Sequence, residues 1–201
     1  MIPWTGESRL DLINFSCGIA NATSYLEIGC NTNEVFDNVN CAHKVGVDPR
    51  TGGTHRMTSD DFFAQNTEKF DVIFIDGLHY YDQVKKDFAN AYKVLNDRGV
   101  VIFHDMFPSL SRWVVVPEPD DLTTYGCWMG DVWRMGFDLI AMQNISFKLV
   151  MIDNGCGFVT KGKQEPRLLP VENTWNFWLL NAGQLPLISY ANLVKSYQVK
   201  S

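Results

Sequence analysis

Four titratable side chains follow two short apolar segments of the sequence, residues 72–75 and 100–103. Apolar runs of this length are typical of strands buried on both faces of a parallel sheet. The four side chains are Asp76 and His79 after the first segment, and His104 and Asp105 after the second. Carboxylates and imidazoles are groups that transfer protons or bind metal ions near neutral pH. Because ligands bind at the carboxyl ends of parallel strands, we expect these four groups to converge on a reaction site.

The segment between the two strands has the periodicity of a helix. Its apolar residues fall on one stripe, at Val84, Phe88, Ala91, Tyr92 and Leu95. Asp82 is a candidate N-cap, and Asp97-Arg98-Gly99 is typical of a helix end. The order strand, helix, strand predicts a right-handed crossover, which makes the two strands parallel.

The composition is that of a single soluble domain. A chain of 201 residues, 46% hydrophobic and 20% charged, can bury a core of its own. The net charge of −6 disfavours a nucleic-acid-binding protein, and no stretch approaches the ~18 apolar residues of a membrane span. The amino-terminal sequence has no signal-peptide pattern. Five widely spaced cysteines form no C-x-x-C, so we expect reduced thiols and a cytoplasmic location.

The beginning of the chain contains a strand, a tight loop and a second strand. Residues 8–21 have helical spacing and would cover an edge or mouth of the sheet. A strand over residues 25–28 leads into the loop Gly29-Cys30-Asn31-Thr32-Asn33 and a helical segment over residues 34–40, an arrangement that presents backbone N–H groups to a ligand. The loop has one glycine, and both the dinucleotide fingerprint and the P-loop are absent.

A carboxylate at the next strand end makes a nucleotide-like ligand more plausible than the loop alone does. Residues 44–47 end at Asp48, which is placed to accept hydrogen bonds from vicinal ribose hydroxyls. The alternative is that Asp48 and Pro49 form only a turn. A third strand-to-helix junction follows at residues 57–61, with Ser59 as the expected N-cap and Asp60 in the first helical turn.

The second half of the chain is less regular. Residues 107–127 contain three prolines and little periodicity, and a loop of this length predicts a lid or binding loop. Residues 128–141 are expected to form a helix, and Asp153-Asn154-Gly155 to turn a hairpin between strands at residues 147–152 and 157–160. An aromatic cluster at residues 175–179, before a helical segment at 189–197, favours core or a subunit contact, and hence a homo-oligomer through this segment.

Taken as an ordered set, LEIGCN, VGVD, SDDFF, FDVIFIDGLH and GVVIFHD resemble the class I S-adenosylmethionine-dependent methyltransferases. The chain is most similar to the small-molecule O-methyltransferase-like group, whose fourth strand ends in D-G-x-H and whose fifth ends in H-D. Trp128 to Trp133, W-x-G-D-V-W, and the turn at Asn154-Gly155 also look like that group. The resemblance implies an α/β, Rossmann-like, doubly wound, mostly parallel seven-stranded sheet with a C-terminal antiparallel hairpin. It implies one domain over residues 1–201, with its core at 20–162 and an extension at 163–201.

The resemblance also implies where the cofactor binds. In this family the first loop meets the methionine part, the acid after the second strand holds the ribose, and the next junction approaches adenine. The matching positions are Glu27, Gly29, Asn31, Asp48, Ser59, Asp60 and Asp76. The sequence departs from the family where Cys30-Asn31-Thr32 replaces a glycine-rich loop.

In metal-dependent members of this family, a divalent ion binds at the two strand ends. The matching ligands are Asp76, His104 and Asp105, since two carboxylates and an imidazole can form one face of an octahedral site. His104 stands where relatives often have a carboxylate, which favours an ion softer than magnesium, or none. His79 and His104 are the candidate bases, with Asp105 as orienter or ligand. The alternative for each histidine is a strand-end side chain satisfied by backbone groups.

We therefore expect methyl transfer from S-adenosylmethionine to a small-molecule acceptor, most simply a hydroxyl group on a sugar or secondary metabolite. One alternative is an NAD(P)-dependent oxidoreductase, which would share the acid at residue 48. This sequence, however, lacks the second and third glycines of the dinucleotide fingerprint. Another is a non-catalytic nucleotide-binding module in which the carboxylates only cap loops. Adenine methylation on nucleic acid is disfavoured, because the fourth strand lacks N/D-P-P-Y. Acceptor identity, and O- against N-methylation, depend on the variable loops.

Overall fold

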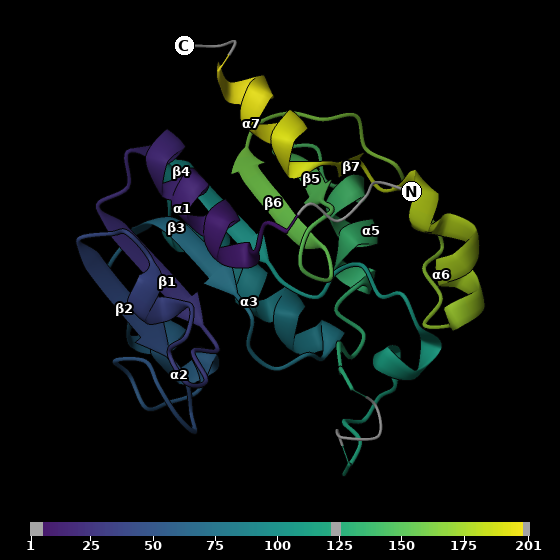
Figure 1. Ribbon diagram of the computed structural model, residues 1–201, viewed down its shortest axis with the longest axis horizontal. Helices are drawn as coiled ribbons and strands as arrows, with labels where there is room; N and C mark the ends of the chain where they lie inside the picture. Colours follow the sequence, from purple (N-terminus) through teal and green to yellow (C-terminus); the bar gives the residue numbers. More distant parts are fainter. Residues whose placement is uncertain (1–5, 122–125, 199–201) are drawn as a thin grey trace.

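A mixed sheet forms the centre of the molecule (Figure 1). The structure, a computed structural model, describes residues 6–121 and 126–198. The described strands are β1 Ser24–Ile28, β2 His43–Val47, β3 Phe70–Ile75, β4 Leu95–Phe103, β5 Ile145–Val150, β6 Cys156–Lys161 and β7 Leu187–Ile188. They lie in the order β2-β1-β3-β4-β6-β5-β7, and β6 is the one described strand that runs antiparallel to its neighbours. The predicted seven-stranded, mostly parallel sheet with an antiparallel hairpin is confirmed.

Helices cover both faces of the sheet. The described helices are α1 Arg9–Ala20, α2 Ser59–Gln65, α3 Tyr81–Val94, α5 Arg134–Ala141, α6 Trp175–Asn181 and α7 Tyr190–Gln198, with 3-10 turns η1 Phe36–Asn38, η2 Ser111–Val114 and η3 Ala182–Gln184. Helices α1 and α7 contribute to the core on one face, and α2, α3, α5 and α6 to the core on the other. Among the described residues, no helix is long and apolar enough to cross a bilayer.

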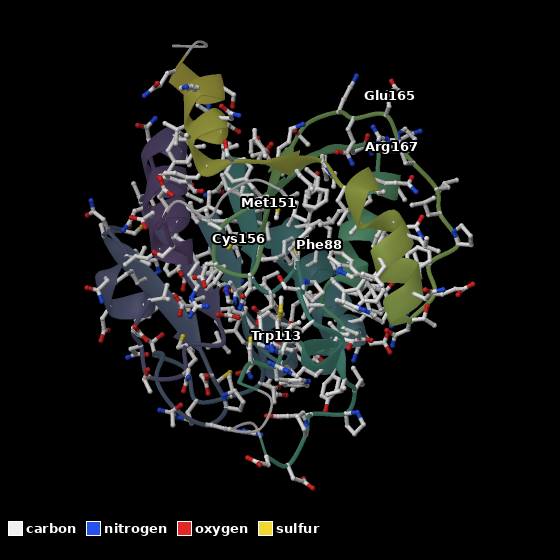
Figure 2. All side chains as sticks on the ribbon, turned by 45° about the vertical axis from the view of Figure 1, so that its right-hand side comes forward. Phe88, Trp113, Met151, Cys156, Glu165 and Arg167 are labelled. Atoms are coloured by element: carbon white, nitrogen blue, oxygen red, sulfur yellow. The ribbon has the colours of Figure 1, made fainter. Side chains whose placement is uncertain are left out.

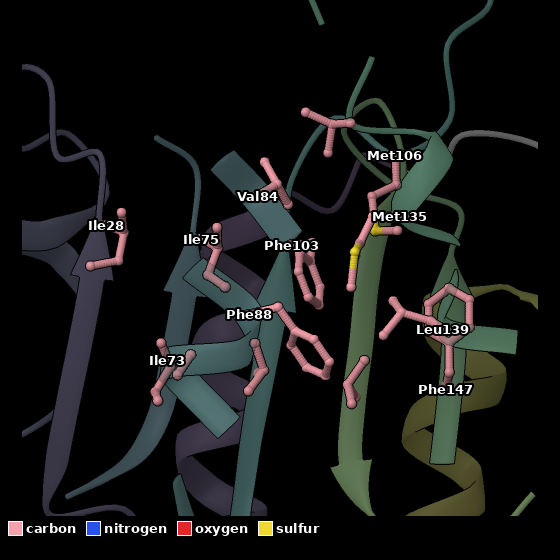
Figure 3. Packing of buried hydrophobic residues seen from close by; sticks show 14 of the residues in the cluster. Ile28, Ile73, Ile75, Val84, Phe88, Phe103, Met106, Met135, Leu139 and Phe147 are labelled. Carbon is pink, nitrogen blue, oxygen red and sulfur yellow. The ribbon is translucent and has the colours of Figure 1, made fainter. Parts of the chain in front are cut away.

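The apolar run of β3 is buried on both faces, as the sequence predicts. Val72 and Phe74 pack on the α1 side, whereas Ile73 and Ile75 face the other side together with Phe88 of α3 (Figure 3). Side chains alternate along a strand, so a run without polar residues fits only a strand that is covered twice. The two cores therefore place α1 on one face of the sheet and α3 on the other.

Several predicted boundaries are wrong for local reasons. Residues 34–40 form only the turn η1, because Lys44 Nζ donates to the carbonyl groups of Phe36, Asp37 and Val39, which a helix would otherwise use. The N-cap of α2 is Thr58, whose side chain accepts from the Asp61 N–H, so Ser59 is the first helical residue and not the cap.

The boundary between α3 and β4 also differs from the prediction. Helix α3 ends at Val94, and Leu95 pairs with Phe70 as the first residue of β4, so Asp97-Arg98-Gly99 lies inside that strand. The sequence also predicts a third strand-to-helix junction at residues 57–61. Among the described residues between β2 and α2, only an isolated bridge between Val47 and His55 forms, and no strand. The described sheet reaches seven strands through β7, which the sequence did not predict.

The predicted helix over residues 128–141 is shorter than expected. Only α5 is helical, and Gly130 has φ +54 with its ideal Cβ position 1.8 Å from the His79 carbonyl oxygen. This contact requires a left-handed glycine and interrupts any helix there. Of the predicted lid at residues 107–127, residues 122–125 lie outside the described part, and the rest contains η2. The movement of this loop stays a prediction.

The described part of the extension, residues 163–198, covers both faces of the sheet, with α6 in the core on the α3 side and α7 in the core on the α1 side. Glu165 and Arg167 lie at the opposite end of the molecule from Trp113 (Figure 2). The reason is that β6 runs antiparallel to β4, so the chain leaves β6 beside the amino end of β4, whereas Trp113 follows the carboxyl end of β4. Phe177 and Trp178 are buried in the core, as one interpretation of the aromatic cluster predicts. Assembly of copies through this segment stays a prediction.

Candidate active site

A cavity of about 830 Å³ opens at the carboxyl ends of β1 to β4. Its volume falls within the roughly 300–1,000 Å³ of small-molecule sites. Every residue that the sequence predicts for the site lines it, namely Glu27, Gly29, Asn31, Asp48, Ser59, Asp60, Asp76, His79, His104 and Asp105. Order along the sheet places Asp48 at one end, after β2, and His104 and Asp105 at the other, after β4. The cavity therefore joins the predicted ribose site to the predicted reaction site.

The loop after β1 replaces missing glycines with asparagines. Gly29 has φ +90, and a Cβ there would lie 2.2 Å from the carbonyl oxygen of Asp76, so this position requires glycine. Asn31 and Asn33 also have positive φ, a conformation that asparagine tolerates better than most residues. The Asn33 side chain accepts a hydrogen bond from Gly53 N, which ties this loop to the one after β2. A tight loop thus forms without the glycine-rich sequence.

Asp48 is buried and held by backbone groups. Its carboxylate accepts hydrogen bonds from the N–H groups of Asn31 (2.9 Å), Arg50 (2.7 Å) and Thr51 (2.9 Å). Burial opposes ionisation, but these hydrogen bonds hold the pKa of Asp48 below its usual value. A carboxylate has about four acceptor positions, so one remains for a ligand hydroxyl. The turn interpretation and the ribose interpretation are compatible here, because the carboxylate can serve both.

The start of α2 lines the cavity beside Asp48. Gln83 of α3 donates to Ser59 Oγ (3.2 Å), Asp60 Oδ1 (3.1 Å) and Asp87 Oδ1 (3.1 Å). Burial raises the pKa of Asp87 to about 6, although hydrogen bonds from Ser59 and Gln83 oppose this. One amide of α3 therefore positions both residues that the sequence assigns to the adenine end.

Strand alternation puts one row of ionisable residues on the α1 face. Glu27 pairs with Phe74 in the β1–β3 register, and Phe74 packs with α1. Asp76 comes two residues after Phe74, and His104 two residues after Ile102, so both belong to the same face. Glu27 is buried and accepts a hydrogen bond from the Tyr25 hydroxyl. Burial raises the pKa of Glu27 to about 7.

The four predicted groups of the reaction site meet, as the sequence predicts. Asp76 Oδ1 lies 3.2 Å from His104 Nδ1 and 3.4 Å from His79 Nε2. Asp105 reaches both rings as well, with Oδ1 3.3 Å from His104 Nδ1 and Oδ2 3.5 Å from His79 Nδ1. Asp105 has φ +56, which an aspartate tolerates, and Asn154 Nδ2 donates to its Oδ1. Each carboxylate therefore contacts both imidazoles.

The charges of this cluster balance. Burial disfavours protonated imidazoles, but Asp76 and Asp105 raise the pKa of His79, and with Asp153 they raise that of His104 well above its usual range. Burial likewise disfavours the Asp76 carboxylate, but the two histidines lower its pKa. The two carboxylates therefore favour the protonated form of both rings.

His79 and His104 differ in accessibility. The His104 side chain is 4% exposed, and its Nε2 lies 3.5 Å from Asp153 Oδ1. The His79 side chain is 20% exposed and stacks on the Trp128 ring at 5.3 Å between centroids. His79 is therefore the histidine that a ligand in the cavity can reach.

The W-x-G-D-V-W segment positions His79, a role that the sequence did not assign. The Trp128 carbonyl lies 3.0 Å from His79 Nδ1, and Asp131 N donates to the His79 carbonyl oxygen. The Asp131 carboxylate accepts from the Tyr81 N–H (2.7 Å) at the start of α3 and from Arg134. Only the left-handed Gly130 lets the two backbones approach this closely. The segment is a clamp on the loop that carries His79.

Three of these groups could hold a metal ion. The ligand atoms of Asp76, His79 and Asp105 all lie within 4.8 Å of one another. The sequence predicted His104 as the third ligand, whereas this group contains His79, and His104 turns its Nε2 to Asp153. Two carboxylates and an imidazole suit Mn²⁺, Zn²⁺ or Fe²⁺ better than a site of oxygen ligands alone would.

Sequence reasoning missed two ionisable residues of the cavity region. Arg9, at the start of α1, lines the cavity with Nη1 2.8 Å and 3.0 Å from the two ring nitrogens of His104 and 3.8 Å from Asp76 Oδ2. Asp153, in the β5–β6 turn, accepts from Arg9 N and lies 3.6 Å from Arg9 Nε. An arginine at a helix start and an aspartate in a hairpin turn have no sequence pattern that separates them from surface residues.

Comparison with known proteins finds a similar domain over the part of the chain that forms the cavity. Residues 21–106 match a protein family described as a methyltransferase domain. That segment contains β1 to β4 and all ten predicted positions. No curated protein matches the chain.

Solved structures share the fold. A putative caffeoyl-CoA O-methyltransferase from Staphylococcus aureus is 18% identical, with a TM-score of 0.58 over 80% of this chain and 86% of that chain. An O-methyltransferase from Bacillus cereus in complex with SAH is 16% identical, with a TM-score of 0.54 over 80% and 84%. The O-methyltransferase TomG from Streptomyces achromogenes, in complex with SAM, is 14% identical, with a TM-score of 0.53 over 76% and 79%. At these identities the likeness is one of fold.

Proposed function

We propose that this chain, a class I methyltransferase by its domain match and its fold, transfers the methyl group of S-adenosylmethionine to a hydroxyl group of a small molecule. One observation carries the proposal. A single cavity joins the buried carboxylate of Asp48 to the cluster of Asp76, His79 and Asp105. A sulfonium displacement requires donor and acceptor to be aligned, and a continuous cavity of this size can hold both.

The cofactor lies along the β2-β1-β3 edge. Asp48 accepts hydrogen bonds from the ribose, and Ser59 and Asp60 approach the adenine. The methionine part crosses Gly29 and Asn31 toward Glu27 and Asp76. Structures of the shared fold that are described as bound to SAH or SAM support this placement.

The acceptor occupies the end of the cavity at His79. Leu78, Glu118, Cys127 and Trp128 line this end, and Glu118 and Cys127 belong to the predicted lid. An acceptor hydroxyl there loses its proton as the methyl group arrives, and without a metal ion His79 is the base that the hydroxyl can reach. The names of the structural neighbours, which are O-methyltransferases, support oxygen over nitrogen as the acceptor atom.

A divalent cation is the second part of the proposal. Asp76, His79 and Asp105 would hold it, and the donor set fits because their three ligand atoms all lie within 4.8 Å of one another. Such an ion lowers the pKa of an acceptor hydroxyl. His104 stays buried between Asp76 and Asp153, and its contacts with both carboxylates keep them in place.

Product formation tests the function. The protein is incubated with S-adenosylmethionine and, separately, with catechols, simple phenols and monosaccharides, and S-adenosylhomocysteine is measured. We expect product only when an acceptor is present. Cofactor binding without product from any hydroxyl class would favour the non-catalytic module.

Chelation tests the metal. EDTA, and the substitution Asp105→Asn, should abolish turnover while S-adenosylhomocysteine affinity stays nearly unchanged. Asp97→Asn, at an exposed carboxylate near the start of β4, is the matched control and should leave turnover intact. Full activity in EDTA would remove the metal and leave a histidine as the only base.

A further inference from the structure

One cation in the cavity has no role in methyl transfer as proposed above. The Arg9 side chain enters the cavity from α1 and is 30% exposed. Its contacts with the described residues use the backbone N, Nε and Nη1, and none of the described hydrogen bonds uses Nη2. A guanidinium has five donors, so this arginine keeps donors for a ligand.

We propose that Arg9 binds the carboxylate of the cofactor's amino-acid end and so selects a complete S-adenosylmethionine. The inference rests on the proposed function, because it names a further residue that holds the same cofactor. Its ligand is an α-amino carboxylate, the group that distinguishes this cofactor from plain nucleosides.

The geometry of a sulfonium leads to this residue. Its sulfur carries three branches, which are the adenosyl group, the methyl group and the aminobutyrate chain. With the adenosyl group at Asp48 and the methyl group directed to His79, in the loop that leads into α3, the third branch points to the remaining wall. Strand alternation places Glu27, Asp76 and His104 on that wall, beneath α1 and Arg9.

The charges of that wall fit a zwitterion. Glu27 and Asp76 can accept from an ammonium group, but they would repel a carboxylate. Among the described residues that line the cavity, Arg9 and Arg50 are the arginines, no lysine lines it, and Arg50 lies next to Asp48 at the far end. The two histidines of the cavity already contact carboxylates of the protein, so Arg9 is the cation near β1 and β3 that keeps free donors for a ligand carboxylate, and its planar fork suits two parallel hydrogen bonds.

The start of α1 holds Arg9 in position. Ser8 and Asp11 form a capping box at the helix start, and Asp153 accepts from Arg9 N at 3.2 Å. The side chain is less constrained, since both its carboxylate contacts are long, 3.8 Å from Nη1 to Asp76 and 3.6 Å from Nε to Asp153, and its short contacts are from Nη1 to the His104 ring alone. A fixed backbone with a loosely paired guanidinium can turn toward a carboxylate without unfolding the helix.

A binding cycle tests the proposal. Calorimetry measures wild type, Arg9→Met and Arg9→Lys with three ligands, S-adenosylhomocysteine, its decarboxylated analogue and 5′-methylthioadenosine. The last has no amino-acid branch, so its affinity reports whether each variant keeps a folded adenosyl site. Arg50→Met is the matched control for the loss of a cavity arginine.

We expect Arg9→Met to weaken S-adenosylhomocysteine roughly 10- to 100-fold, the usual effect of a charge-assisted pair, and Arg9→Lys to weaken it less. The decarboxylated analogue and 5′-methylthioadenosine should bind Arg9→Met as they bind wild type. Arg50→Met should change all three affinities by the same factor. An Arg9→Met protein whose preference for S-adenosylhomocysteine over the decarboxylated analogue equals that of wild type would overturn the inference alone. Failure of wild type to bind S-adenosylhomocysteine would overturn the proposed function and this inference together.

Discussion

The two ends of the cavity are built in different ways. The cofactor end is held by backbone groups of neighbouring loops, as Asp48 shows by binding N–H groups within 17 residues of itself in the chain. The reaction end is held by groups far apart in the chain, since His79 is fixed by Trp128, 49 residues away, and His104 contacts Arg9, 95 residues away. The first end is local structure and the second depends on packing. Each should therefore fail separately when its own support is removed.

Substitution of Gly29 should disrupt the cofactor end of the cavity, and substitution of Gly130 should disrupt the reaction end. Gly29→Ala forces a Cβ into the Asp76 carbonyl oxygen at φ +90, where backbone strain alone costs about 1–3 kcal/mol. We expect the loop to shift and S-adenosylhomocysteine affinity to fall by more than about tenfold, as measured by calorimetry. Gly18→Ala, in open space on α1, is the control. Wild-type affinity in Gly29→Ala would show that the loop does not meet the cofactor.

Gly130→Ala should lower kcat and leave cofactor affinity nearly unchanged, the reverse of the effect expected for Gly29→Ala. Its Cβ would lie 1.8 Å from the His79 carbonyl oxygen and push the clamp away from that loop. A misplaced catalytic group costs about 100-fold in rate, so kcat should fall by that order while S-adenosylhomocysteine affinity stays within about twofold. Equal losses of affinity in both glycine variants would contradict the separation of the two ends.

Substitution of Asp48 tests the cofactor end of the cavity alone. Asp48→Ala removes the acceptor for the ribose and should weaken S-adenosylhomocysteine by about 1.5–3 kcal/mol in calorimetry. It also leaves three backbone N–H groups unpaired, so Asp48→Asn, which keeps one side-chain oxygen, should lose less. Unchanged affinity in Asp48→Ala would remove the ribose role and leave the turn interpretation.

The smallest expected effect is a pH dependence of S-adenosylhomocysteine binding that arises from Glu27. Its pKa of about 7, raised by burial, means that the carboxyl group is mostly protonated below pH 7 and ionised above it. An ammonium group gains from the ionised form only, so S-adenosylhomocysteine affinity should rise up to about tenfold from pH 6 to pH 8. Glu27→Gln should flatten this profile. A wild-type profile that falls over this range would place the ammonium group elsewhere.

The sequence predicts the cofactor end well because the signals there are local. A buried strand, its polar end residue and the following turn lie within ten residues of one another, and Asp48 and Asp76 are found this way. The loop at Asn31 and Asn33 departs from the family pattern in sequence only, since asparagine reaches the same left-handed backbone as glycine.

The reaction end is predicted in part, for a physical reason. His79, His104 and Asp105 follow strands and are found from pattern. Arg9 and Asp153 meet them only through the packing of α1 and of the β5–β6 turn, which no periodicity encodes. Gly130 appears inside an apparently helical segment, and only its contact with the His79 backbone explains why the helix begins four residues later.

Calorimetric titration of the wild-type protein with S-adenosylhomocysteine, S-adenosylmethionine and NAD tests the central claim most directly. An adenosyl site at Asp48 that continues to a zwitterion site at Glu27, Asp76 and Arg9 predicts one-to-one binding of the first two ligands and no binding of NAD. Tight binding of NAD, or no heat with either S-adenosyl ligand, would contradict it.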